Sequence, residues 1–360
     1  MTRSQLLGGV LLLAAFASAC SSDGVAKWPE PPVQRTQHVA TGPAPSPDTP
    51  TGQERGLAAT YIKALESPDF EALGSMFEDQ AHFAYRGRTT HGRDRVLKGH
   101  AEMFGAFDQR QFVATRVWLT DSTHPLDSQA VEWTMTGVQA RDFLGVPATH
   151  KRVVIKGLSL LWTSDTGVIS DVHVYFDEEL VKAQLGVGPA ELQKLPVPSL
   201  DAATAPQILE RTGAPEEASN AKVMRSMVQA LEDNKESDFL ALMSDGVQIC
   251  TMDHAEPTTG KKAASDYFRT MRRSIRLLDT VIENAWGVQS FAVTEYAVTG
   301  LQFAPFPRVP FAEGRPLHTQ FADVAEIHDG RVTRIWRYDD PLGFAAHDGI
   351  DDHDSKGPRK

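Results

Sequence analysis

Three side chains near the middle of the chain could do acid/base chemistry. His173, Tyr175 and Asp177 stand at alternate positions of an extended segment, so they would share one face of a β-strand. A carboxyl group in an apolar pocket has a raised pKa and can move a proton to and from a carbon next to a carbonyl. An imidazole and a hydroxyl beside it could orient that carbonyl or stabilise an enolate. We therefore predict Asp177 as a catalytic acid/base that His173 and Tyr175 assist.

A structural role for Asp177 is an equally open interpretation. The residue directly precedes EELVKAQLG, which has a helical pattern, and aspartate is a preferred residue at the N-cap of a helix. A tyrosine and an aspartate at the end of a strand are therefore also consistent with a structural pair.

The other face of this strand would carry Val172, Val174 and Phe176. If Asp177 faces the pocket, these apolar residues form the outer face of the sheet and need a cover. We predict that the second half of the chain or a second chain pairs with this face.

The chain repeats the same segment further on. Residues 167–177 read GVISDVHVYFD and residues 330–340 read GRVTRIWRYDD, which places Tyr175 and Tyr338 163 residues apart. Gly137 of TMTGVQ and Gly300 of AVTGLQ show the same spacing. A constant offset in two strand-like segments indicates two copies of one domain.

The second copy presents a different set of side chains at the equivalent face, namely Arg334, Trp336, Tyr338 and Asp340. An arginine near the aspartate would hold it ionised, which favours anchoring of a ligand over proton transfer. We predict these four residues as ligand-binding, and expect the first copy to be the active one if either is.

Each copy begins with helices and continues with long strands. In the first copy, apolar residues at helical spacing predict two helices that meet at Ser67-Pro68, and the segment from Gly92 predicts a third. Segments rich in Val, Thr, Trp and Leu then predict antiparallel strands. The sequence thus predicts an α+β fold of two tandem cone-shaped domains, each a curved antiparallel sheet around N-terminal helices. Trp118 and Trp133 lie in predicted strands and could line a pocket, although plain packing suits them equally.

The N-terminal residues predict export from the cytoplasm. An apolar run too short to span a bilayer follows Arg3, and small residues then lead to Cys20. This pattern resembles the lipobox of bacterial lipoproteins, in which Cys20 would carry the lipid; an ordinary secretory signal cleaved near Ala19 is the alternative. Ser21 after the cysteine resembles lipoproteins of the outer membrane. We expect a protein of the bacterial cell envelope that is anchored in the outer membrane through lipid.

The composition narrows the range of partners. The net charge is −11 and no basic patch stands out, which argues against nucleic acid. The chain has two cysteines, so lipidation of Cys20 would leave Cys250 without a disulfide partner. The predicted organisation is a signal peptide at 1–19, a lipidated cysteine and Pro/Ser-rich tether at 20–52, a first domain at 53–187, a linker at 188–214, a second domain at 215–345 and a disordered tail at 346–360.

Residues 53–187 resemble the SnoaL-like polyketide cyclases, or ester cyclases, of the nuclear-transport-factor-2-like fold. The resemblance rests on TGVQARDFLGVPATHKRVVIKGLSLL from Thr136 and on VYFDEELVKAQLG, and the matching loop residues are Phe143, Gly145, Pro147, Thr149 and Lys151. It implies acid/base chemistry without a metal or cofactor, with Asp177 at the position of the family's acid/base aspartate. The second copy keeps Thr299-Gly300 and the Tyr338-x-Asp340 ending, but its loop lacks the pattern.

Three functions follow from these observations, and fold alone does not choose among them. The pockets could bind a small apolar or aromatic molecule without turnover, which we favour because no second unmistakable catalytic group accompanies Asp177. The first domain could instead be a cofactor-independent cyclase, isomerase or hydrolase. The tandem domains could also form a scaffold with filled cores. A cavity lined by Asp177 and His173 would favour the enzyme, an Asp177 turned onto the following helix would favour binding, and a core filled by Trp and Phe would favour the scaffold.

Overall fold

The computed structural model describes residues 51–67, 70–86, 88–120, 128–188, 190, 192–194, 205–252, 256–305 and 313–339. The predictions on the signal peptide, Cys20, the tether, Asp340 and the tail lie outside these residues. Among the described residues, no helix is both long and apolar enough to cross a membrane.

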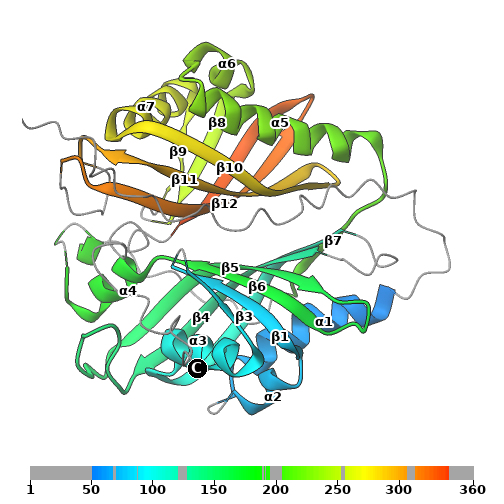
Figure 1. Ribbon diagram of the computed structural model, residues 1–360, viewed down its shortest axis with the longest axis vertical. Coiled ribbons are helices and arrows are strands. Elements are labelled where there is room, and N and C mark those ends of the chain that lie inside the picture. Colours follow the sequence, from blue (N-terminus) through cyan, green and yellow to red (C-terminus); the bar gives the residue numbers. More distant parts are fainter. Residues whose placement is uncertain are drawn as a thin grey trace, which may run out of the picture. The chain divides into compact units, whose positions relative to one another are not determined.

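The first copy folds into a sheet with the strand order β2-β1-β6-β5-β4-β3-β7 (Figure 1). Its strands are β1 (Phe77–Tyr85), β2 (Arg88–His91), β3 (Phe107–Leu119), β4 (Ser128–Gln139), β5 (Arg152–Thr163) and β6 (Ile169–Phe176), and its helices are α1 (Thr51–Ala64), α2 (Glu71–Gly74), α3 (Arg93–Phe104) and α4 (Glu178–Leu185). β1 pairs with β6 in parallel, while the long strands β3 to β6 pair antiparallel.

The second copy has the strand order β10-β11-β12-β13-β8-β9. Its strands are β8 (Met243–Thr251), β9 (Thr258–Thr259), β10 (Ile275–Val288), β11 (Phe291–Gln302), β12 (Pro316–His328) and β13 (Arg331–Asp339), and its helices are α5 (Pro215–Glu232), α6 (Glu236–Ala241) and α7 (Gly260–Ser274). If β8 to β13 are matched in turn with β1 to β6, the two orders are the same, and β7 is an additional strand at the edge of the first sheet. The predicted α+β fold and the tandem duplication are therefore confirmed.

The segment predicted as a linker contains structure of its own. A short 3-10 helix, η1 (Leu192–Lys194), is followed by β7 (Gln207–Glu210), which adds to the edge of the first sheet in parallel with β3. A strand that pairs with an open edge removes its free backbone groups from solvent. β7 leads to α5, so the start of the second copy is fastened to the sheet of the first.

Strand β6 is buried on both faces, and this reverses one prediction. Val172, Val174 and Phe176 lie in the core of the first domain together with residues of α1 and α3, so they do not form an outer face. Tyr175 points the opposite way, into a second apolar cluster. The strand period fixes which residues share a face, but with apolar residues on both sides it does not decide which face is inside.

The second cluster contains side chains from both sheets. It is made by Trp118, Ala130, Leu158, Leu160, Trp162, Tyr175 and Leu209 of the first sheet and its added strand, and by Trp286, Val288, Phe291, Val293, Ala322, Val324 and Tyr338 of the second. The sheets thus bury their outer faces in a common apolar layer. The prediction that Val172, Val174 and Phe176 form a covered outer face was therefore wrong, because the common layer lies on the face of Tyr175.

The interior of the first domain is filled by aromatic side chains. Trp133 is fully buried, and its ring centroid lies 5.6 Å from that of Phe104 and 6.3 Å from that of Phe176. Its indole Nε1 donates to Ser159 Oγ at 3.0 Å. The ring lies over Gly157, where a Cβ atom would come within 2.3 Å of it.

Gly157→Ala should therefore destabilise the protein, because the added methyl group collides with Trp133. Overpacking of this kind costs about 1–3 kcal/mol in the free energy of unfolding, measurable by urea denaturation. Gly246→Ala is the matched control, because Gly246 is exposed on β8 and a Cβ there meets nothing within 4 Å. Equal stabilities of the two variants would show that the interior is not packed against Gly157.

Candidate active site

Two rows of side chains cross the interior face of the second sheet. The register places Thr294, Asp323 and Arg337 side by side on β11, β12 and β13, and Tyr296, Phe321 and Asp339 in the next row. Tyr296 and Phe321 belong to the core of the second domain. Because side chains two positions apart share a face, the whole set points into this interior.

The polar members of this set form one hydrogen-bonded group. Arg337 Nε donates to Asp323 Oδ1 at 2.8 Å, and Arg337 Nη2 donates to Oδ2 at 2.5 Å and to the Tyr296 hydroxyl. The Tyr296 hydroxyl donates to Asp323 Oδ2 at 3.1 Å. Asp323 is fully buried and Arg337 is 5% exposed. A two-pronged pair of this kind fixes both the position and the orientation of the carboxylate.

Burial raises the pKa of Asp323 well above its usual range; the hydrogen bond from Tyr296 lowers it, and the neighbouring Asp339 raises it further. Burial also lowers the pKa of Arg337 to about 10, so the guanidinium remains a cation at neutral pH. A carboxyl group that holds its proton to higher pH beside a cation is suited to acid/base work.

Three buried polar atoms at this cluster have no hydrogen-bond partner among the described residues: Arg337 Nη1, the Tyr267 hydroxyl and Thr294 Oγ1. Tyr267 belongs to α7, and the guanidinium carbon of Arg337 lies 4.6 Å from the centroid of its ring. A buried donor without a partner costs about 1–3 kcal/mol, and an ordered water or a bound molecule would remove that cost. An oxygen of a small ligand beside Arg337 would satisfy at least one of them.

The first domain has different side chains at the equivalent positions. Its two rows are Val131, Ser159 and Val174, followed by Trp133, Gly157 and Phe176. Uncharged residues stand where the second domain has Asp323, Arg337 and Asp339. The same strand positions therefore carry Ser159, Val174 and Phe176 in the first copy and a charged set in the second.

One further polar chain crosses the first interior. The Tyr61 hydroxyl lies 3.1 Å from His100 Nε2, and His100 Nδ1 lies 2.8 Å from the carbonyl oxygen of Val96. Because a carbonyl only accepts, Nδ1 carries the proton and the Tyr61 hydroxyl donates to Nε2. Burial lowers the pKa of His100 to about 4. Its hydrogen bonds are satisfied within the core, which identifies His100 as a structural residue.

Asp177 is placed at the N-cap of α4. Its Oδ1 accepts from the backbone N–H of Leu180 at 3.0 Å, and the side chain is 2% exposed. The capping interpretation is therefore confirmed. His173 and Tyr175 point to the other face of the sheet, where both contact Glu295 of the second domain. The structure thus brings His173 and Tyr175 together but separates them from the interior of the first domain.

The residues that carry the family resemblance hold the same helix. Lys151 Nζ donates to the carbonyl oxygen of Leu185 at 2.9 Å, and Gly186 ends α4 in the left-handed conformation. The side chain of Gln184 exchanges two hydrogen bonds of 2.8 Å with the backbone of Val154 on β5. These residues clamp α4 onto the sheet, so in this chain the motif is explained by packing.

Of the other predicted ligand-binding residues that the structure describes, Trp133 alone lies in an interior. Trp118 and Tyr338 lie in the layer between the sheets, and the hydroxyl of Tyr338 donates to Glu132. The guanidinium group of Arg116 lies over the ring of Trp336, with 3.8 Å between the guanidinium carbon and the ring centroid. Arg334 Nε donates to Gln248 Oε1 at 2.6 Å.

Our sequence analysis did not predict the site around Asp323, although the sequence contains one signal for it. Asp323 and Arg337 stand at positions of the same parity as apolar neighbours in their strands, Phe321 and Ala325 for Asp323 and Ile335 for Arg337. The consecutive Asp339 and Asp340 allow either face of β13 to carry an aspartate. We followed the face of Asp340 because of the repeated Tyr-x-Asp ending, whereas the interior face is that of Asp339.

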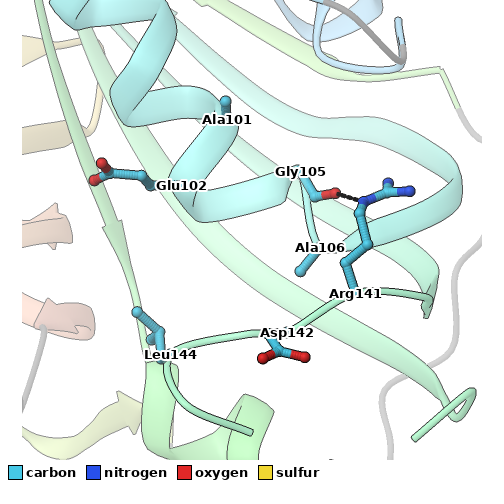
Figure 2. Close-up of a pocket in the computed structure, with 7 residues that line it drawn as sticks. All are labelled: Ala101, Glu102, Gly105, Ala106, Arg141, Asp142 and Leu144. Carbon is cyan, nitrogen blue, oxygen red and sulfur yellow. Dashed lines mark hydrogen bonds between the residues drawn. The ribbon is translucent and has the colours of Figure 1, made fainter. Parts of the chain in front are cut away.

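An open surface pocket of about 450 Å³ lies at the C-terminal end of α3 (Figure 2), lined by Ala101, Glu102, Gly105, Ala106, Arg141, Asp142 and Leu144. Arg141 donates to the carbonyl oxygen of Gly105 at 2.7 Å and to Asp108 at 2.6 Å. The lining has charged and small residues rather than the aromatic residues that we expected. Arg141 braces the loop here, and the pocket contains no buried acid/base pair.

Comparison with known proteins identifies both copies. The profile described as "SnoaL-like domain" matches residues 58–172 and residues 224–335, which together make up more than half of the chain. A search of curated proteins gives no match.

Several solved structures are similar over about one copy. A protein from Jannaschia sp. CCS1 described as a SnoaL-like polyketide cyclase has 20% identity and a TM-score of 0.34, and the match covers 37% of this chain and 93% of that one. An M. tuberculosis epoxide hydrolase described as LEH-like has 15% identity and a TM-score of 0.30, with 37% and 90% covered. A nuclear-transport-factor-2-like protein from Anabaena variabilis has 15% identity and a TM-score of 0.29, with 34% and 89% covered.

Substitutions at Asp177 test its role as a cap. Asp177→Asn should be nearly neutral, because asparagine also accepts from the N–H groups of the first turn, whereas Asp177→Ala should cost about 1 kcal/mol. Thermal or urea unfolding of both variants measures the difference. A loss with Asn as large as that with Ala would contradict a simple capping role.

His100 should make stability depend on pH. Its pKa in the folded state, about 4, lies below the ordinary value of 6.5, so its contribution is fully present above pH 6.5 and is lost as the pH falls toward 4. At about 1.4 kcal/mol for each pKa unit, the loss amounts to roughly 3 kcal/mol. Urea unfolding as a function of pH measures it. His100→Gln should flatten this slope, and His150→Asn, at an exposed position, should leave it unchanged.

Proposed function

This chain belongs to the SnoaL-like domain family, and on that basis we propose that its second domain carries out cofactor-independent acid/base chemistry on a small molecule. In this proposal the protein is anchored through Cys20 in the bacterial cell envelope and acts as an isomerase or hydrolase. The proposed active group is Asp323 with Arg337, Tyr296 and Asp339.

The observation that carries the proposal is the buried pair of Asp323 and Arg337 with a guanidinium nitrogen left over. Burial raises the pKa of Asp323 well above its usual range, which favours a carboxyl group that can carry a proton. Arg337 Nη1 has no partner among the described residues and is free to hold an oxygen that gains negative charge. The hydroxyl of Tyr296 fixes the orientation of the carboxyl group.

The first-domain positions that correspond to Asp323, Arg337 and Asp339 lack these features. A buried carboxylate that the first domain does have, Glu178, lies at the start of α4, where it accepts from the Tyr85 hydroxyl and pairs with Arg86 at 3.5 Å. Trp133 and Phe176 stand at the positions of Tyr296 and Asp339, and the side chain of Asp177 caps α4. We therefore assign proton transfer to the second domain, in contrast to the expectation from the sequence. The first domain serves as a structural partner in this proposal.

Binding without turnover is the second candidate, and one observation favours it. Both carboxylate oxygens of Asp323 already accept hydrogen bonds, from Arg337 and from Tyr296. A proton carrier must exchange one of these bonds for a substrate, whereas a ligand anchor needs only the free nitrogen of Arg337.

Activity of the purified protein distinguishes the two candidates. Hydrogen exchange in D₂O measured by NMR on a panel of small ketones, together with hydrolysis of a panel of epoxides and esters, covers the reaction classes that one carboxyl group can support. Asp323→Asn should reduce the rate about 10²- to 10⁴-fold. Asp177→Asn, which alters an aspartate outside this group, should leave the rate unchanged.

The opposite pattern, with activity lost in Asp177→Asn and kept in Asp323→Asn, would place the chemistry in the first domain. If no compound on either panel reacts but native mass spectrometry finds a small molecule that Arg337→Ala releases, binding without turnover is the correct function.

A further inference from the structure

A second polar cluster lies in the layer between the two sheets, on the opposite face of the second sheet from Asp323. His173 on β6, Glu295 on β11 and Glu283 on β10 each offer one ligand atom, and these atoms lie within 4.8 Å of one another. His173 and Glu295 are buried, and Glu283 is partly exposed. We infer that this cluster is a binding site for a divalent metal ion, with Zn²⁺ the best match, that links the two domains.

The donor set suits zinc. Zinc binds both histidine nitrogen and carboxylate oxygen, and sites with three protein ligands keep a fourth position for water. Mg²⁺ and Ca²⁺ prefer ligand sets made of oxygen alone, so the imidazole argues against them. Partly exposed Glu283 provides a path for the ion and for the water.

Each proposed ligand is held by a neighbour. His173 Nδ1 faces Glu295, while Nε2 lies 3.5 Å from Asp171 Oδ1. Histidines that bind metals commonly direct their other nitrogen to a carboxylate, which orients the ring. The remaining support comes from Tyr175 and Asn284, which both donate to Glu295, and from Gln320, which donates to both oxygens of Glu283 at 3.1 Å.

The fold places Glu283 at the cluster through an irregularity. The pairing of β10 with β11 shifts between Ile282 and Asn284, so Glu283 is an extra residue in the strand. A bulge of this kind redirects a side chain and is often found beside functional sites. Without it, strand alternation would set Glu283 and Asn284 on opposite faces, whereas here both are near Glu295.

Metal binding has a simple proton balance. In the metal-free protein, the bond between His173 and Glu295 contains one proton. When Zn²⁺ binds, that proton leaves to solvent and the nitrogen and the carboxylate both turn to the ion. No oxidant or reductant is involved, and the result is a bridge from β6 to β10 and β11.

The test is zinc binding by the purified full chain at about pH 8, measured by elemental analysis after dialysis and by calorimetry. The wild type should retain one Zn²⁺ at this site, and Glu283→Gln and Glu295→Gln should both lose it. Asp171→Asn should weaken binding roughly 10- to 100-fold, because it removes only the orienting carboxylate.

Glu132→Gln is the matched control. Glu132 is another carboxylate in the layer between the sheets, bonded to Tyr338 and Arg116 but outside the cluster, so this variant should keep the zinc. Asp323→Asn should also keep it, which separates this inference from the proposed enzymatic activity. Glu283 is partly exposed, so Glu283→Gln gives a readout even if Glu295→Gln does not fold. Equal zinc content in the wild type and Glu283→Gln would overturn the inference and assign any bound metal to other residues.

Discussion

The apolar layer between the two sheets constrains both domains. Each sheet has an interior face toward its own helices and a second face that contributes side chains to this layer, so the central strands are buried on both faces. Polar groups inside such a layer must find partners there, because an unpaired buried polar group is costly. Glu295 is matched by His173 and Tyr175, and Glu132 by Tyr338 and Arg116. The layer therefore contains specific polar contacts between the copies as well as apolar packing.

The two copies differ more in their interior side chains than in the order of their strands. Both copies keep the same strand order, yet Ser159 of the first domain corresponds to Asp323 of the second, and Val174 to Arg337. A buried ion pair adds little to stability compared with well-packed apolar residues, so stability alone does not explain why the second interior keeps one. Departures from good packing are expected at functional or strained sites, which supports the proposed role of Asp323 and Arg337.

The order of helices and strands and the duplication could be predicted because they depend on local patterns and on a constant spacing of 163 residues. The site could not, because it depends on which of two faces is the interior. In β6 the alternation separates Val172 and Val174 from His173 and Tyr175, and both groups are buried. The hydrophobic pattern therefore fits either orientation equally well. Only the register with neighbouring strands shows that Asp339, rather than Asp340, is in line with Phe321 and Tyr296.

The contacts between the domains and the candidate active site lie on the same strands. On β11, Glu295 stands between Thr294 and Tyr296, and on β13, Tyr338 stands between Arg337 and Asp339. Glu295 and Tyr338 both make hydrogen bonds to the first domain. These contacts hold β11 and β13 in place on the face opposite the candidate active site. Catalytic groups need support that fixes their geometry closely, and rigid strands supply it better than loops. This arrangement gives the first domain a role even without chemistry of its own, since its sheet supports the strands that hold Asp323 and Arg337 together.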